Sequence, residues 1–129
     1  MKILALDYGA ARTGVAISDE TGAIARPLAV VERAATPKGL AHVCELVRQQ
    51  GVERVVVGLP LTLRGERGSQ ALETEEFVHA LRALLEIPVE TYDERFTTIL
   101  AAGTRGAAPE DARAAAHLLE SYLMRMQPR

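Results

Sequence analysis

The sequence predicts an α/β domain in which five strands form one mixed sheet flanked by helices. Two apolar runs, residues 3–6 and 55–57, lack the polar alternation of a half-exposed strand, which is typical of central strands covered on both faces. Helical periodicity separates the later strand-like runs and favours parallel pairing through right-handed crossovers. We expect the order βββαβαβα in a single domain, residues 1–129, because a chain of this length buries about two-thirds of its unfolded surface.

The chain opens with three extended segments separated by tight turns, a pattern that predicts antiparallel strands. Gly14 and Gly22 supply turn residues between them. Pro27 lies inside the third segment and indicates an edge strand or a bulge, because proline has no N–H to donate to the ladder. The three segments are residues 3–7, 15–18 and 23–31.

Helices alternate with the two remaining strands. Thr36 and Pro37 predict an N-cap and a first helical residue, and Gly51 predicts the end of that helix. Cys44 lies on its apolar stripe, and we interpret it as a small buried hydrophobe because nothing nearby would lower its pKa. The predicted strands are residues 54–58 and 89–92; the predicted helices are residues 37–50, 69–85 and about 109–126, with a short helical piece through Ile99 and Leu100.

Composition and charge limit the classes of function. One cysteine excludes an internal disulfide framework and a cysteine-based zinc site, and neither a signal peptide nor a membrane-spanning apolar run is visible. We therefore expect a cytoplasmic protein without membrane contact. The formal net charge of −2 provides no overall field that attracts nucleic acid. However, 13 of the 15 lysines and arginines are arginine, which suits phosphate contacts or, equally, reflects genomic base composition.

Carboxylates occur at three places where the predicted fold does not otherwise favour them. Asp7 ends an apolar strand, where a buried charge is costly unless it is paired or binds a metal. Asp93 and Glu94 follow the fifth strand. Asp111 shares a helical stripe with apolar residues of the last helix, although it would also suit the first turn of a helix by complementing the dipole.

We expect these acids to meet at one edge of the sheet, because the carboxyl ends of parallel strands lie together. Clustered carboxylates repel one another, and hard divalent cations prefer oxygen ligands. The sequence therefore predicts a Mg²⁺ or Mn²⁺ site formed by Asp7, Glu94 and Asp111, with Asp93 as the alternative to Glu94. Only one of these two neighbours is expected to bind directly, because alternation along a strand directs them to opposite sides. The remaining metal-ligand candidates, His42, His79 and His117, have no ligand spacing and are interpreted as surface or packing residues.

Four motifs follow one another along the chain: LALDYG with RTGVA (residues 4–16), VGLPL (57–61), DERFTT (93–98), and Asp111 with ESYL (120–123). Together they resemble the YqgF/RuvX family over essentially the whole chain. The resemblance implies a ribonuclease H-like fold and a nuclease named for processing the 5′ end of pre-16S rRNA and related to Holliday junction resolvases. It also implies that the acidic centre consists of Asp7, the Asp93–Glu94 pair and Asp111.

Phosphodiester hydrolysis of this kind uses two metal ions about 4 Å apart. We expect Asp7 to bridge the ions. Arginines near the motifs are candidates for gripping flanking phosphates without base specificity, although Arg95 has the alternative role of an ion-pair partner of Asp93. The phosphate-contact candidates are Arg12, Arg64, Arg67 and Arg95.

The expected partner is structured RNA such as pre-rRNA, or branched DNA, and the sequence leaves both open together with a monomeric or homodimeric state. Two other classes of function remain as alternatives. The Asp-Tyr-Gly turn and following hairpin also resemble the first phosphate loop of actin-like ATPases, but those proteins enclose a nucleotide between two lobes. An inactive member of the family that serves as a nucleic-acid-binding assembly factor is the other alternative.

Overall fold

The computed structural model describes residues 1–96 and 109–126. Its strands and helices follow the predicted order, with one additional 3-10 turn after the last strand. The expected helical piece through Ile99 and Leu100 lies outside the described residues. The elements are β1 (Ile3–Asp7), β2 (Arg12–Ser18), β3 (Ala25–Glu32), α1 (Pro37–Gln50), β4 (Arg54–Leu59), α2 (Ser69–Leu84), β5 (Val89–Asp93), η1 (Glu94–Phe96) and α3 (Glu110–Met126).

The five strands form one mixed sheet in the order β3-β2-β1-β4-β5. The pairs β1–β2 and β2–β3 are antiparallel, whereas β1–β4 and β4–β5 are parallel. Both the antiparallel opening and the parallel crossovers are therefore confirmed. Pro27 lies on the edge strand β3, beside an irregularity in its register with β2, as its missing N–H predicts.

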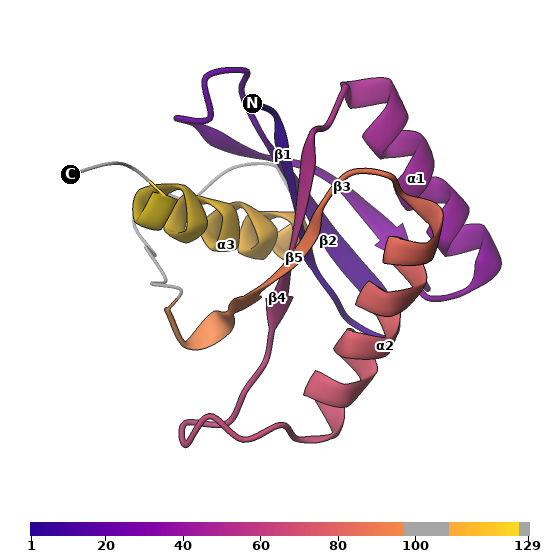
Figure 1. Cartoon of the computed structure of the whole chain (residues 1–129), viewed down its shortest axis with the longest axis vertical. Helices are drawn as coiled ribbons and strands as arrows, with labels where there is room; N and C mark the ends of the chain where they lie inside the picture. Colours follow the sequence, from indigo (N-terminus) through magenta and orange to yellow (C-terminus); the bar gives the residue numbers. More distant parts are fainter. Residues whose placement is uncertain (97–108, 127–129) are drawn as a thin grey trace.

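Helices cover both faces of the sheet, which explains why its central strands are apolar throughout (Figure 1). On one face, α1 and α2 pack on Leu4 and Leu6 of β1. On the other face, α3 packs on Ile3 and Ala5 of the same strand. Because successive side chains of a strand point to opposite faces, a single run of four apolar residues fills two separate cores.

The signals for α1 act as the sequence predicts. The hydroxyl of Thr36 accepts a hydrogen bond from the Gly39 N–H at 3.1 Å, and Gly51 ends the helix with φ of 66°. Cys44 is half-buried, and this burial raises the pKa of its thiol, in keeping with a packing role. None of the helices in the described parts of the chain is long and apolar enough to cross a membrane.

Candidate active site

Two carboxyl groups from distant parts of the chain meet at one edge of the sheet. Asp7 ends β1, and Glu94 begins η1 directly after β5. Because both strands are parallel to β4, which lies between them, their carboxyl ends come to the same side. The two carboxyl groups lie close enough together for each to shift the pKa of the other.

Burial determines how this pair titrates. Desolvation is the largest cause that raises the pKa of Glu94, and together with the charge of Asp7, the hydrogen bond with Asp7 and the charge of Asp93 it raises this pKa to about 7. Burial also raises the pKa of Asp7; the hydrogen bond with Glu94 acts in the opposite direction, and the charge of Asp111 adds to the rise. The pair therefore holds a proton to higher pH than ordinary carboxyl groups do.

Gly58 makes room for the Glu94 side chain. This glycine follows Val57, whose partner in β1 is Leu6, so it lies beside the end of β1. A Cβ atom at position 58 would lie 2.5 Å from Oε1 and 3.0 Å from Cγ of Glu94. The sequence analysis missed this role, although a glycine that interrupts an apolar strand indicates a close approach by another group.

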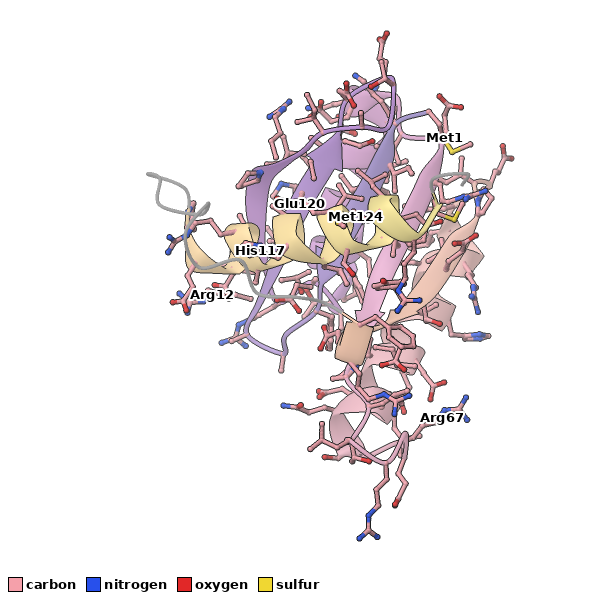
Figure 2. All side chains as sticks on the ribbon, turned by 90° about the vertical axis from the view of Figure 1, so that its left-hand side faces the viewer. Met1, Arg12, Arg67, His117, Glu120 and Met124 are labelled. Carbon is pink, nitrogen blue, oxygen red and sulfur yellow. The ribbon has the colours of Figure 1, made fainter. Side chains whose placement is uncertain are left out.

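Asp111 reaches the same edge from the other layer, in the first turn of α3. Gly14 pairs with Asp7 across the β1–β2 ladder, and a Cβ atom on Gly14 would overlap the backbone carbonyl of Asp111. The missing side chain thus allows α3 to begin directly over the strand pair that carries Asp7. Asp111 Oδ2 lies 3.3 Å from Nε of Arg12 in an ion pair that is largely exposed, and Figure 2 shows Arg12 near the start of α3.

Asp93 and Glu94 have different partners. Asp93 pairs with the guanidinium of Arg95, at 2.6 Å between Oδ2 and Nη2, and the hydrogen bond from Arg95 lowers the pKa of Asp93. Glu94 is the one of the two that contacts Asp7. Of these two neighbouring acids, Glu94 therefore belongs to the acidic pair with Asp7, and Asp93 belongs to the ion pair with Arg95.

The other two arginines singled out from the sequence lie in residues 60–68, which we call the β4–α2 loop. This loop projects beyond the end of the sheet (Figure 1). Arg67 Nε lies 3.3 Å from Oε2 of Glu75 on α2, and Figure 2 shows Arg67 on the projecting loop. Arg64 is exposed, and no ion pair of its side chain is found in the part of the chain that the structure describes.

A cleft of about 250 Å³ opens beside the acidic pair. Asp7 and Glu94 line one side of it, and polar residues from the first half of α2 line another. Tyr8 lies at the cleft and stacks on Phe77 of α2, with 4.5 Å between ring centroids. The sequence analysis did not identify the α2 residues, because their contribution depends on how α2 packs on the sheet; they are Gln70, Glu73 and Thr74.

The chemistry of the acidic pair fits a divalent cation only in part. Two half-buried carboxyl groups that lie close together are the kind of group a hard cation would neutralise. Among residues 1–96 and 109–126, however, no three His, Cys, Asp or Glu side chains lie close enough together to hold one ion. In this arrangement only Asp7 and Glu94 would face one ion together, and Asp111 would join them only by leaving Arg12. His42 and His79 are exposed, and His117 is buried on α3.

The sequence was compared with known proteins. Residues 1–125 match the family model described as "RuvX: Holliday junction resolvase". Relatives that carry the name "Putative pre-16S rRNA nuclease" include one from Chloroflexus aurantiacus (strain J-10-fl), which is 45% identical over 94% of this chain and 85% of its own length. Another, from Syntrophomonas wolfei, is 39% identical over 95% of this chain and 94% of its own length.

Solved structures agree with the ribonuclease H-like fold. The structure of T. thermophilus RuvC in complex with a Holliday junction substrate superposes with a TM-score of 0.63 at 18% identity, over 98% of this chain and 96% of that one. The Fowlpox virus resolvase in complex with Holliday junction DNA gives a TM-score of 0.60 at 13% identity, over 99% of this chain and 100% of the other. At these identities the likeness establishes the fold, which is ribonuclease H-like as the motifs implied.

Proposed function

The chain belongs to the RuvX family, and from this premise we propose that it is a metal-dependent endonuclease that hydrolyses phosphodiester bonds in structured nucleic acid. We further propose that its substrate is the 5′ end of pre-16S rRNA, in keeping with the name its relatives carry. Such a substrate implies action in the cytoplasm.

The observation that carries the proposal is the contact between Asp7 and Glu94 in a cleft at the end of parallel strands. A strand that served only for stability would have no reason to end in a half-buried acid beside a second half-buried acid. The room that Gly58 leaves for Glu94 supports the same conclusion, since the strand loses side-chain packing there.

Asp7, Glu94 and Asp111 are the residues that would hold Mg²⁺ or Mn²⁺, and we expect two ions with Asp7 shared between them. When bound, such ions activate water and neutralise the charge that develops on the phosphate. Carboxyl groups bind a metal in their ionised form, so the site should become competent as the pH rises through the Glu94 pKa of about 7. Asp93 takes no ligand role here, because Arg95 holds its carboxylate.

The arginines serve to position the substrate. Arg12, Arg64 and Arg67 lie on the hairpin and the loop that flank the acidic edge, where they can bind phosphates on either side of the cleaved bond. A phosphate that draws Arg12 away from Asp111 would free that carboxylate for the site. The guanidinium of Arg95 lies on the same side but is already paired with Asp93.

Branched DNA is a second candidate substrate. The family model is described as a Holliday junction resolvase, and two solved structures of similar fold are bound to Holliday junctions. The acidic pair acts on a phosphodiester whichever sugar carries it, so the chemistry of this edge does not favour one polymer over the other.

The test is cleavage by the wild type and by Asp7→Asn, purified in parallel. We expect the wild type to cut a labelled pre-16S-like RNA with Mn²⁺ and not with chelator. Asp7→Asn should lose several orders of magnitude in rate, because water activation and charge stabilisation depend on the same ligands. A four-way DNA junction is assayed alongside the RNA to decide between the two substrates.

Equal cleavage by both proteins would mean a contaminating nuclease or an active site elsewhere. Metal-independent binding of the RNA with no cleavage by either protein would support a nucleic-acid-binding assembly factor instead of an enzyme.

A further inference from the structure

Arg95 makes contacts on two sides. Its Nε and Nη2 donate to the carboxylate of Asp93 at distances of 2.6 to 3.1 Å, and its Nη1 donates to the carbonyl oxygen of Leu63 at 3.3 Å. The Arg95 N–H also donates to Asp93, at 2.9 Å. A guanidinium with a bidentate carboxylate partner is held in one direction. Hydrogen bonds of the Arg95 side chain therefore link the end of β5 to the β4–α2 loop.

The β4–α2 loop is closed by its own hydrogen bonds. The N–H of Thr62 donates to the carbonyl of Glu66 at 3.0 Å, and the N–H of Gly65 donates to the carbonyl of Thr62 at 2.8 Å. The hydroxyl of Thr62 accepts from the N–H of Glu66 at 3.0 Å. Gly65 has a φ of +81° and lies against the Arg95 guanidinium. A Cβ atom added to Gly65 would lie 3.3 Å from Nη1 of Arg95. Hydrogen bonds therefore link Thr62, Gly65 and Glu66 of the loop to one another.

The residue after Arg95 is also anchored. The carbonyl of Phe96 accepts a hydrogen bond from the Ser121 hydroxyl at 2.9 Å, and that hydroxyl is 2.8 Å from the hydroxyl of Tyr92. The guanidinium of Arg125 lies 3.9 Å from the centre of the Phe96 ring. Both residues that follow Glu94 are thus tied to neighbouring elements, one to the loop and one to α3.

We propose that Arg95 is a positioning residue that holds the β4–α2 loop at a set distance from Glu94, so that Arg64 meets a substrate phosphate while the acids meet the scissile one. This inference rests on the proposed function. The sequence left two roles open for Arg95, a phosphate contact and an ion pair with Asp93, and the positioning role builds on the second. The ion pair with Asp93 fixes the direction of the Arg95 side chain, so both residues are required for this role.

The test compares Arg95→Gln, Asp93→Asn and the double variant in binding to a fluorescein-labelled stem-loop RNA and to a four-way DNA junction. Binding is measured in chelator by fluorescence anisotropy over a series of salt concentrations. We expect each single variant to weaken binding to the same extent and to lower the log–log salt slope by about 0.9, the loss of one duplex phosphate contact. The double variant should bind no more weakly than either single variant.

Whether Asp93→Asn weakens or strengthens nucleic-acid binding decides between the positioning role of Arg95 and a direct phosphate contact. If Arg95 itself contacted a phosphate, Asp93→Asn would remove a negative charge, free the guanidinium and strengthen binding, while Arg95→Gln alone would weaken it. That result would overturn the inference, as would additive losses or unchanged binding in both variants. Arg64→Ala should weaken wild-type binding but add nothing in the Arg95→Gln background, an outcome that a general loss of stability would not produce.

Arg48→Gln is the matched control, because Arg48 is an exposed arginine paired with Glu45 on α1; its binding should equal that of the wild type. None of these measurements requires cleavage, so they remain informative if the nuclease proposal fails. If the wild type binds neither nucleic acid, the proposed function fails, and amide hydrogen exchange of Gly65 and Glu66 decides the positioning role. Faster exchange in both single variants supports it, and unchanged exchange overturns it.

Discussion

Glu94 illustrates at the residue scale how burial turns an ordinary acid into a group that titrates near neutrality. Its pKa rises to about 7 chiefly because the surroundings exclude water, and the neighbouring charge of Asp7 adds to the effect. Asp93, one residue earlier, has its pKa lowered by the hydrogen bond from Arg95. Environment rather than residue type therefore separates the two acids, and one of them remains available to gain and lose a proton.

The pH dependence of stability follows from this shift. The Glu94 pKa is about 7 in the folded protein against an ordinary value of 4.5, so between these values the folded state binds more protons than the unfolded state. The contribution of Glu94 to stability is fully present below 4.5, falls as the pH rises and is lost above about 7. Urea unfolding in chelator at several pH values across this range measures it.

Glu94→Gln is the control for that measurement, because it keeps the shape of the side chain without titrating. The difference in unfolding free energy between wild type and Glu94→Gln should shift against the wild type as the pH rises. A difference in unfolding free energy that does not change with pH would contradict the raised pKa of Glu94.

Metal binding should stabilise the folded protein, because a cation neutralises carboxylates that otherwise repel one another. We expect Mg²⁺ or Mn²⁺ to raise the melting temperature of the wild type, with a stabilisation of about 2.7 kcal/mol at a hundredfold excess over Kd. Asp7→Asn should show little of this rise and should be at least as stable as the wild type without metal, because repulsion is relieved. Thermal melts with and without each cation measure the effect; an equal rise in both proteins would place the bound ion elsewhere.

At the scale of elements, two glycines allow two other elements, α3 and η1, to approach the end of β1 that carries Asp7. Gly14 lets the backbone of α3 approach the β1–β2 hairpin, and Gly58 lets the Glu94 side chain approach β4. The two close approaches differ in kind, since the first involves a helix backbone and the second the end of a side chain. A methyl group added at each position should therefore have different consequences.

Gly14→Ala should destabilise the fold by about 1–3 kcal/mol, because a packed helix must shift. Gly58→Ala should leave the melting temperature close to that of the wild type but displace the Glu94 carboxyl, and so lower metal-dependent cleavage and weaken metal binding. Melting, metal titration and cleavage are measured on both variants. Full cleavage by Gly58→Ala would show that Glu94 need not occupy its present place.

At the scale of the whole molecule, the charge distribution matters more than the total charge. The chain carries a formal net charge of −2, yet Arg12, Arg64 and Arg67 lie near the acidic edge and on the projecting loop. Substrate affinity should therefore come from a few local arginines and should not require a basic molecule overall.

Affinity for duplex nucleic acid should fall steeply with salt, and the slope should decrease in the Arg64→Ala, Arg67→Ala double variant by about 0.9 per lost phosphate contact. Anisotropy titrations at several salt concentrations measure the slope. Arg48→Ala, which changes an exposed arginine on α1, should leave the slope unchanged. A double variant with wild-type affinity and slope would exclude the loop as a phosphate contact.

The order of elements, the mixed sheet and the capping of α1 could be predicted from the sequence, because apolar periodicity, turn residues and caps are local properties. The acids Asp7, Glu94 and Asp111 could also be singled out, because each is a charge in a segment that is otherwise apolar or at a strand end. Local signals of this kind do not depend on which distant segments become neighbours.

Only the tertiary structure decided that Glu94 contacts Asp7 while Asp93 pairs with Arg95, that Arg12 holds Asp111, and that the first half of α2 lines the cleft. By itself, the sequence indicated which acids are candidates for the chemistry and the edge of the sheet at which they lie. Their pairing depends on burial and on distances between residues far apart in the chain, such as 7 and 94. Desolvation and Coulomb energies vary with these distances, and periodicity contains no information about them.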